Sequence, residues 1–381
     1  MKIVYSVDAK LGGSGIGFIA YNAAAGIYHA GFVTRLFVSS NAQTTIPNAL
    51  IRQWGILGRG LKYLAAKDST GLIAYLENTF FDYWVAPQLP DARIFHGWNN
   101  MCLQSLRRAK VRGMTTVVER ASAHPATQTR LLREEYARWN VLLKLPTWNY
   151  ARALRELAQA DYITVPSPFV RDSMIAAGVP ERKLIEIPFG VDLQRFAPAD
   201  QKDAHPFRAV FAGTVSIRKG VPDLLEAWRR LAWRDAELVL VGAVAPDFAA
   251  IRAQWANLPG VRFVPHTPEL ARVIQQCDVF VFPSIEEGSA LVTYEAMAAG
   301  IPVITTPNAG SVARDGEDGF IVPIRDVDAL CERLERLRRD DALRTRMGRA
   351  ARACIQDFTW KHYQERLLST YERINSNALL Q

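Results

Sequence analysis

The stretch Val279–Val303 reads VFVFPSIEEGSALVTYEAMAAGIPV and has the pattern of a buried strand, a turn and a helix. Its first four residues form an apolar run that ends at Pro283, which is typical of a strand covered on both faces. Helical spacing begins at about Ser289 and stops before Gly300. The chain repeats this βα order throughout, which predicts parallel, doubly wound sheets because crossover connections are right-handed.

Two carboxylates stand on either side of the helix start in this unit. Glu287 comes where the strand reaches the carboxyl edge of the sheet, the usual ligand position in open α/β sheets, and Glu295 lies early in the helix. Free amides at a helix start can hold a phosphate, and carboxylates accept hydrogen bonds from hydroxyls. A ligand with a sugar, a diphosphate and a ribose would suit this arrangement. A solvated acidic turn before an ordinary core helix is the alternative.

The Glu287 and Glu295 pair, with seven residues between and the run EAMAAGIPV closing it, closely resembles the signature of glycosyltransferase family 4. Members of that family are retaining, nucleotide-sugar-dependent enzymes with the GT-B fold. The resemblance implies an α/β chain of two Rossmann-like, doubly wound parallel-sheet domains facing across a cleft. It covers the second half tightly and the first half loosely, so the donor side is better defined than the acceptor side.

Length and charge constrain the possible partners. At 381 residues the chain favours two domains. The net charge of +8 comes from the first half: residues 1–190 carry 22 Lys+Arg against 13 Asp+Glu, and residues 191–381 carry 24 against 25. A basic half could meet anionic lipid headgroups, a phosphate-bearing acceptor or nucleic acid, or could serve solubility alone. No RNA-stacking motif stands out, so nucleic acid is not expected.

The sequence also bears on location. The four cysteines have neither metal-like nor disulfide-like spacing, which fits a reducing cytoplasm. The N-terminus reads as a strand rather than a signal peptide because Asp8 breaks its short apolar stretch. We expect a cytoplasmic protein that contacts the inner face of the cytoplasmic membrane peripherally through its basic half. The basic, amphipathic pattern from Trp54 to Lys67 predicts a helix, packed on the core or lying on a membrane.

A glycine-rich loop, LGGSGIG, follows the first predicted strand, residues 2–8. Glycines let a backbone approach a phosphate closely, and the helix that follows offers amides. The spacing is not that of an NAD-binding loop, and the next strand lacks an acidic end, so a dinucleotide site is weakly supported. The family resemblance instead places Gly12, Gly13 and Ser14 against the donor phosphate and the reacting sugar.

Two further strands, 92–95 and 115–118, lead into polar clusters that we expect at the edge facing the interdomain cleft. His96 resembles a histidine that many family members carry after the first of these strands. Where many relatives have a second histidine, this chain has Glu119-Arg120, with His124 just beyond. Either His96 or His124 could help to handle the acceptor proton, and either could be a structural, hydrogen-bonded histidine.

The second domain begins after a polar, proline-ended linker, residues 200–206. A strand leads into Gly213 and then Arg218-Lys219-Gly220, which resembles the family's glycine-then-Lys-Gly segment. Two cations before a helix start would stabilise a leaving diphosphate. The resemblance also places His266 in the turn where relatives hold the nucleotide base.

The implied domains are residues 1–195, which would bind the acceptor, and 206–361, which would bind the nucleotide sugar, with helix 362–381 packing back on the first. Glu287 would hold hydroxyls of the donor sugar and Glu295 the ribose diol. Four residues of the turn would place their amides nearby: Gly288, Ser289, Ala290 and Leu291.

The implied activity is that of a hexosyltransferase-type enzyme using a UDP- or GDP-linked sugar. The acceptor would be a glycan, a lipid-linked or a small-molecule hydroxyl in polysaccharide, glycolipid or glycoconjugate biosynthesis. No cofactor or metal is expected, because Arg218 and Lys219 would neutralise the diphosphate. A GT-B-fold sugar-nucleotide epimerase and a non-catalytic nucleotide-sugar-binding protein remain as alternatives.

Overall fold

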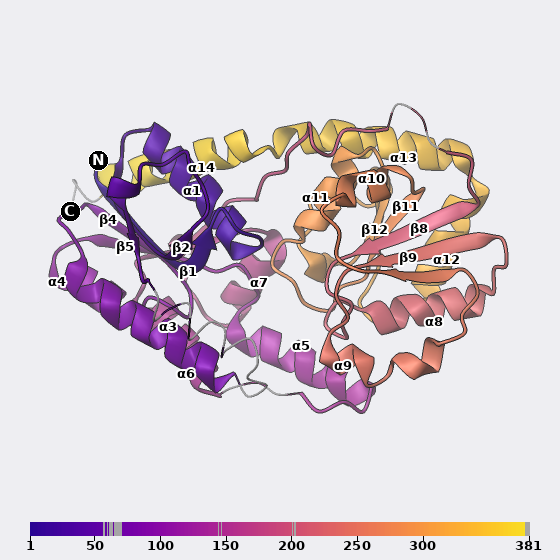
Figure 1. The fold of residues 1–381 in the computed structure, drawn as a ribbon, viewed down its shortest axis with the longest axis horizontal. Helices are drawn as coiled ribbons and strands as arrows, with labels where there is room; N and C mark the ends of the chain where they lie inside the picture. Colours follow the sequence, from indigo (N-terminus) through magenta and orange to yellow (C-terminus); the bar gives the residue numbers. More distant parts are fainter. Residues whose placement is uncertain are drawn as a thin grey trace.

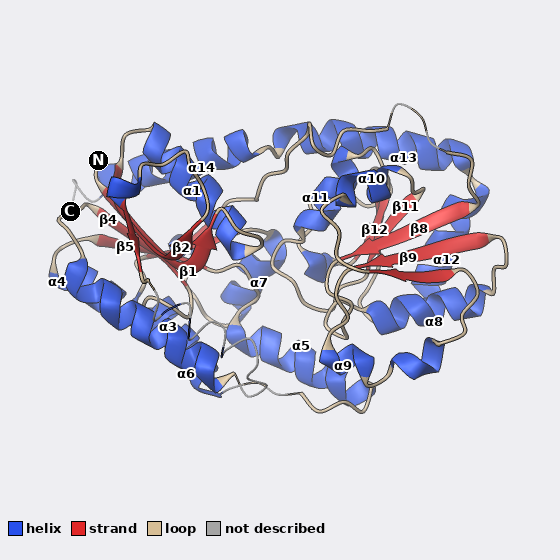
Figure 2. Cartoon of the chain, viewed as in Figure 1, coloured by secondary structure: helices blue, strands red, loops and turns tan. Residues whose placement is uncertain are grey.

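Two parallel β-sheets, each flanked by helices, make up the computed structural model (Figure 1, Figure 2). The structure describes residues 1–377 apart from 56, 57, 59, 61–63, 65–70, 144, 146, 200 and 202. The helix expected between Trp54 and Lys67 falls largely outside the described residues. None of the helices in the described part is long and apolar enough to cross a membrane.

The first sheet has seven strands in the order β3-β2-β1-β4-β5-β6-β7, all parallel. The strands are β1 (Ile3–Leu11), β2 (Val33–Asn41), β3 (Ile51–Gln53), β4 (Ile94–Trp98), β5 (Thr115–Glu119), β6 (Tyr162–Val165) and β7 (Leu184–Glu186). Buried side chains fill both faces of β1, as the parallel arrangement requires.

Helices cover both faces of this sheet. One core contains side chains of α1 (Ile16–His29) and of the last helix, α14 (Trp360–Asn377). The other contains side chains of four helices, α3 (Leu72–Val85), α4 (Leu103–Val111), α6 (Thr147–Gln159) and α7 (Pro168–Ala176).

The second sheet has six parallel strands in the order β10-β9-β8-β11-β12-β13. They are β8 (Phe207–Ala212), β9 (Ala236–Val241), β10 (Val261–Val264), β11 (Val279–Phe282), β12 (Val303–Thr305) and β13 (Gly319–Ile321). The helices around it are α8 (Val221–Leu231), α9 (Pro246–Ala249), α10 (Leu270–Gln275), α11 (Leu291–Ala298), α12 (Val327–Arg339) and α13 (Asp341–Cys354). The doubly wound α/β fold with two Rossmann-like sheets is therefore confirmed.

The chain crosses between the two sheets twice, and the two crossings lie side by side. Val191, on the way out, donates its amide to Phe358 O at 2.9 Å. A Cβ at Gly190 would lie 2.4 Å from Trp360 N, so only glycine fits there without displacement. Helix α14 then runs back along α1 (Figure 1).

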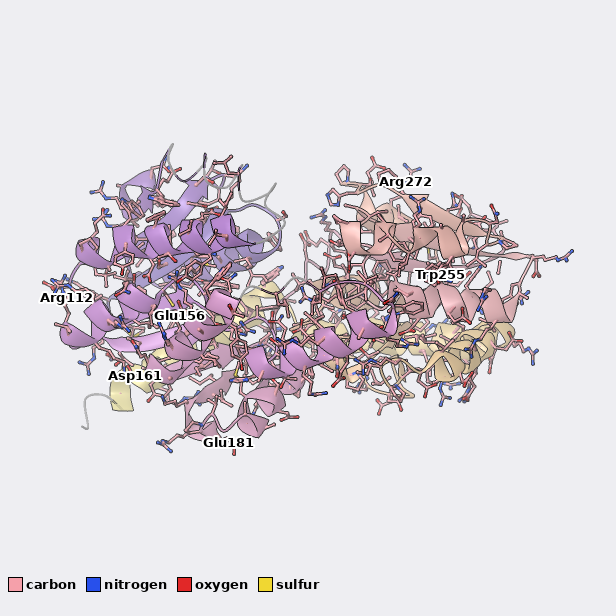
Figure 3. The ribbon with its side chains drawn as sticks, turned by 90° about the horizontal axis from the view of Figure 1, so that it is seen from below. Arg112, Glu156, Asp161, Glu181, Trp255 and Arg272 are labelled. Atoms are coloured by element: carbon pink, nitrogen blue, oxygen red, sulfur yellow. The ribbon has the colours of Figure 1, made fainter. Side chains whose placement is uncertain are left out.

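The apolar spacing of residues 131–145 predicts a helix over that range, and the structure corrects its position. Helix α5 runs instead over Pro125–Arg138, because His124 caps its start and Pro125 occupies the first turn. It extends along the lower edge of the molecule from the first domain toward the second (Figure 1, Figure 3).

Candidate active site between the two domains

The loops that follow β8 and β11 lie together because these strands are neighbours in the second sheet. Ile285 donates its amide to Arg218 O at 3.0 Å. Gly220 has a φ of +68°, and a Cβ there would lie 1.9 Å from Pro283 O. Only glycine allows this approach, which brings Arg218 and Lys219 beside the acidic turn.

The carboxylate of Glu287 stands against both predicted cations. It forms an ion pair with Lys219, and its Oε1 lies 3.4 Å from a terminal nitrogen of Arg218. Burial lowers the pKa of Lys219 to about 7, the charge of Arg218 lowers it further, and Glu286 opposes the shift. The three predicted groups therefore form one charged corner.

Glu286 joins this corner to the first domain. Its side chain is fully buried, and its Oε2 accepts a hydrogen bond from Arg218 Nε at 3.0 Å. From the first domain, Ala123 donates its amide to Oε1 at 3.1 Å and Gln128 donates Nε2 to Oε2 at 3.0 Å. Glu286 therefore binds Arg218, the loop that contains His124 and the start of α5.

Helix α11 starts at Leu291, two residues later than expected. Ala290 donates its amide to Ala309 O at 2.9 Å, so this predicted donor is already occupied. Within the described part of the chain, the structure gives no hydrogen bond to the amides of Gly288, Ser289 and Leu291. These three amides are free to bind an anion at the start of the helix.

Glu295 is held in a poorly solvated position on α11. Burial raises its pKa to about 7, and the charge of Arg195 opposes the shift. Its Oε2 is buried and has no hydrogen-bond partner among the described residues. Arg195 also donates to Pro268 O at 3.4 Å, two residues beyond the exposed His266. Glu295 therefore lies near the turn predicted to hold the base.

The predicted glycines lie in loops at the carboxyl ends of their strands. Gly12 has a φ of +79°, and Gly13 donates its amide to Lys10 O at 2.8 Å, so the chain turns back tightly after β1. Ser14 is exposed in this loop. Gly213 lies at the end of β8, where its carbonyl would be 2.0 Å from a Cβ at Gly242.

The two predicted histidines have different surroundings. His96 lies inside β4 rather than after it, because pairing with β5 continues to Trp98, and its ring is fully buried. Its Nδ1 lies 2.5 Å from Tyr371 OH and its Nε2 lies 3.3 Å from Glu119. The structure thus keeps His96 in the core of the first domain, apart from Glu287, and its catalytic role stays a prediction.

His124 caps α5 in the loop held by Glu286. Its Nδ1 accepts a hydrogen bond from the Ala126 amide at 3.2 Å, so in the neutral ring Nε2 carries the proton. Burial lowers its pKa, and the charge of Arg120 adds to that shift. His124 is therefore the predicted histidine that the structure brings to the interdomain contact.

Backbone contacts also close the two domains against each other around the turn. A Cβ at Gly288 would lie 1.7 Å from Ala121 O, and Ser167 donates its hydroxyl to Gly288 O at 2.6 Å. Leu291 packs against the core of the first domain. The start of α11 is therefore in direct contact with the first domain.

The C-terminal end of helix α5 also contacts the second domain. Arg325, from the loop before α12, donates to Glu135 at 2.7 Å and to Glu134 at 3.0 Å. Trp139 stacks edge-on against Trp255, which Figure 3 labels in the second domain, with 5.5 Å between ring centroids. The helix that begins at His124 is thus fixed at both ends.

Sequence reasoning missed Glu286 and Gln128 as site residues and gave Arg120 no role. Arg120 is buried and donates to Gln128 Oε1 at 3.1 Å and to Asn99 Oδ1 at 2.8 Å. These hydrogen bonds fix the position of the loop that contains His124. The available signal was the doubled acid in the turn, Glu286-Glu287, and the polar residues after β5.

The second domain matches the sequence profile of the family described as glycosyl transferases group 1 over residues 206–340. The chain is 30% identical to MMP alpha-(1->4)-mannosyltransferase of Mycolicibacterium hassiacum over 66% of this chain and 64% of that protein. It is 31% identical to phosphatidyl-myo-inositol mannosyltransferase of Mycobacterium leprae over 51% of this chain and 54% of that protein. The chain spans less than two thirds of the length of either relative.

Solved structures share the whole fold. Sucrose-phosphate synthase from Thermosynechococcus elongatus superposes with a TM-score of 0.71 at 18% identity, covering 99% of this chain and 100% of that one. Anabaena HepE in complex with UDP and glucose gives a TM-score of 0.71 at 16% identity, with 98% and 100% covered. The chain has the GT-B fold, and its residues 206–340 match the family described as glycosyl transferases group 1.

Proposed function

We propose that the protein is a retaining glycosyltransferase that moves a sugar from a nucleotide diphosphate-sugar to an acceptor hydroxyl. One observation carries the proposal: the Glu287 carboxylate stands against both Arg218 and Lys219 at the carboxyl edge of the second sheet. A group that accepts from sugar hydroxyls and two groups that bind phosphate thus lie side by side. The names of the two mannosyltransferases and the UDP-glucose complex of HepE support the same substrate class.

In this proposal each predicted residue has a role. Arg218, Lys219 and the free amides before α11 bind the diphosphate, and their charge offsets the charge that develops as it leaves. The unpartnered Oε2 of Glu295 accepts a ribose hydroxyl. The loop of Gly12, Gly13 and Ser14 covers the phosphate from the first domain, and the base binds at the turn of His266 and beside Gly213.

The reaction breaks the bond between the anomeric carbon and the diphosphate oxygen and forms a bond from the acceptor oxygen on the same face of the sugar. The departing phosphate oxygen takes the acceptor proton, so no protein nucleophile is required. His124, whose Nε2–H is available, orients the acceptor or the diphosphate. With two cations assigned to the diphosphate, the proposal includes neither a metal ion nor a cofactor.

The donor in this proposal is a UDP- or GDP-linked hexose and the acceptor a glycan, a lipid-linked or a small-molecule hydroxyl. The excess positive charge of residues 1–190 supports peripheral contact with an anionic membrane on the cytoplasmic side. The full chain should then sediment with phosphatidylglycerol vesicles at low salt and dissociate at high salt. Equal binding to neutral vesicles would contradict an electrostatic contact.

The Glu287→Ala variant tests the enzyme. Using UDP- and GDP-sugars that raise the melting temperature, we expect turnover to fall at least about 100-fold while the fold is kept. Glu317→Ala, which removes an exposed ion pair with Arg314, is the matched control and should keep full turnover. Unchanged turnover in Glu287→Ala excludes the assigned role, and an inverted product configuration excludes retention. Binding of a nucleotide sugar without turnover by the unmodified chain favours the non-catalytic alternative.

A further inference from the structure

A pocket lies among the helices of the first domain, apart from the charged corner. Its volume is about 330 Å³, at the low end of the range for small-molecule pockets. Its walls are side chains of α3, α4 and α6. They include the aromatic residues Tyr75, Tyr83 and Trp148 and the arginines Arg107, Arg152 and Arg155.

The pocket includes residues at the ends of α4 and α6 that face the cleft. Helices between parallel strands run against the strands, so α4 and α6 begin at the carboxyl edge of the first sheet, where their loops face the second domain. The pocket is lined from α4 by Gln104 and Arg107, and from α6 by Trp148 and Arg155. Gln104 and Trp148 lie in the first turns of their helices, and Arg107 and Arg155 lie further along them.

The floor of the pocket is fixed, and its charged groups are already paired with one another. Asp82 is fully buried and accepts from the amides of Gln104 and Ser105 at 2.7 and 2.9 Å. Arg152 is also buried and donates to Asp82 at 2.9 Å and to Glu156 at 3.1 Å. A ligand therefore does not need to pair with these charges.

The rim, in contrast, offers unpaired positive charge beside exposed rings. Arg107 and Arg155 are exposed, and within the described part of the chain neither has a carboxylate within ion-pair distance. Trp148 is 37% exposed and Tyr83 is 58% exposed, and the rings of Tyr75 and Trp148 lie 6.2 Å apart. Exposed aromatic rings bind the apolar faces of sugars, whereas arginines bind carboxylates and phosphates in pairs of hydrogen bonds.

A continuous chain of buried and partly buried hydrogen bonds joins this floor to the charged corner. Figure 3 labels Glu156, which lies in the middle of the chain, inside the first domain. The successive links are Glu286–Gln128 at 3.0 Å, Gln128–Arg120 at 3.1 Å, Arg120–Asn99 at 2.8 Å, Asn99–Glu156 at 2.9 Å, Glu156–Arg152 at 3.1 Å and Arg152–Asp82 at 2.9 Å. The pocket and the charged corner are therefore held in fixed positions relative to each other, since polar networks of this kind resist rearrangement.

We propose that this pocket binds an anionic sugar unit of the acceptor, with the ring against Trp148 and Tyr75 and the negative group between Arg107 and Arg155. The inference rests on the proposed glycosyltransferase function and adds that the acceptor is an acidic saccharide. Gln104 and Thr79 provide polar contacts to hydroxyls at the wall. The negative group is a carboxylate in a uronic acid or a phosphate in a phosphorylated sugar.

Calorimetric binding to the full chain tests the proposal. The probes are glucuronate-, galacturonate- and mannuronate-containing tetrasaccharides, mannose 6-phosphate, and chitotetraose as a neutral saccharide. We expect an acidic saccharide to bind more tightly than chitotetraose, and preference for uronates or for the sugar phosphate identifies the negative group. The absence of binding by every acidic probe, or equal binding by the neutral one, overturns the proposal.

Matched variants locate the binding. Trp148→Ala and the double variant Arg107→Ala/Arg155→Ala should each weaken the binding at least 10-fold. Phe80→Ala on α3 and Arg108→Ala on α4 remove an exposed ring and an exposed arginine outside the pocket, and should not change it. Equal weakening by the control variants overturns the location.

Melting-temperature shifts with UDP and GDP separate the two levels of inference. Nucleotide stabilisation that is the same in all variants, together with no saccharide binding, refutes the pocket and leaves the proposed function standing. Saccharide binding without any nucleotide stabilisation supports the pocket and contradicts the proposed function.

Discussion

Glu286 holds Arg218 in place: its Oε2 accepts from Arg218 Nε at 3.0 Å, and the Glu286 carbonyl accepts from the same nitrogen at 3.0 Å. The carboxylate is fully buried and also binds the loop of His124. Arg218 faces Glu287 with a terminal nitrogen, so Glu286 sets the direction of the guanidinium that would meet the diphosphate. A carboxylate from the interdomain contact thus controls a cation of the donor site.

Glu286→Gln should therefore reduce kcat more than it raises KM for the donor. Glutamine keeps the shape, but its single acceptor oxygen cannot serve Arg218, Ala123 and Gln128 together. We expect kcat to fall about 10-fold or more, which is about 1.4 kcal/mol of transition-state stabilisation. Steady-state kinetics measure the change, with Glu226→Gln on the surface of α8 as the control. A purely structural role for Glu286 would lower the melting temperature and leave kcat intact.

Glu295→Gln should stabilise the protein more at pH 8 than at pH 5. Burial raises the pKa of Glu295 to about 7, so the folded state holds this proton more tightly than the unfolded state. The stability present below the unfolded pKa is lost as the pH rises through about 7, by at most about 3 kcal/mol. Urea unfolding at both pH values measures the difference. A pH-independent effect of the substitution would show that Glu295 is ionised throughout. The same variant should bind nucleotides less tightly, because the amide accepts fewer ribose hydroxyls.

Lys219 should take up a proton when a nucleoside diphosphate binds. Burial lowers its pKa to about 7, so much of it is neutral at pH 8, and a nearby diphosphate restores the charge. Calorimetry with UDP and GDP in buffers of different ionisation enthalpy should show uptake of up to about one proton at pH 8 and less at pH 6. Affinity should fall as the pH rises above 7. Lys219→Arg keeps its charge and should abolish the uptake, and uptake that survives in this variant would assign the proton to another group.

The sequence pattern was sufficient for most strands and insufficient for the contacts between domains. Buried parallel strands are short apolar runs, so β5 and β11 lie where the pattern places them, whereas β3 is only three residues long and two of these are exposed. Arg218, Lys219 and Glu287 could be grouped because parallel neighbours end at one edge. Which of two adjacent acids faces the first domain depends on residues more than 150 positions away, and no local pattern contains that information.

Arg325→Ala should loosen the closed arrangement of the two domains. Arg325 donates to Glu134 and Glu135 and to Leu131 O at 3.1 Å, and it is the described cation that ties α5 to the loop before α12. Its loss leaves the fully buried Glu135 with fewer donors, and we expect about 1–3 kcal/mol less stability. Small-angle X-ray scattering should show a larger radius of gyration without nucleotide and a return toward the original value when UDP or GDP binds. Arg314→Ala breaks an ion pair of similar geometry inside the second domain and should leave the radius unchanged. An unchanged radius in Arg325→Ala would mean that α14 and the turn at Gly288 hold the domains together without the contact between Arg325 and α5.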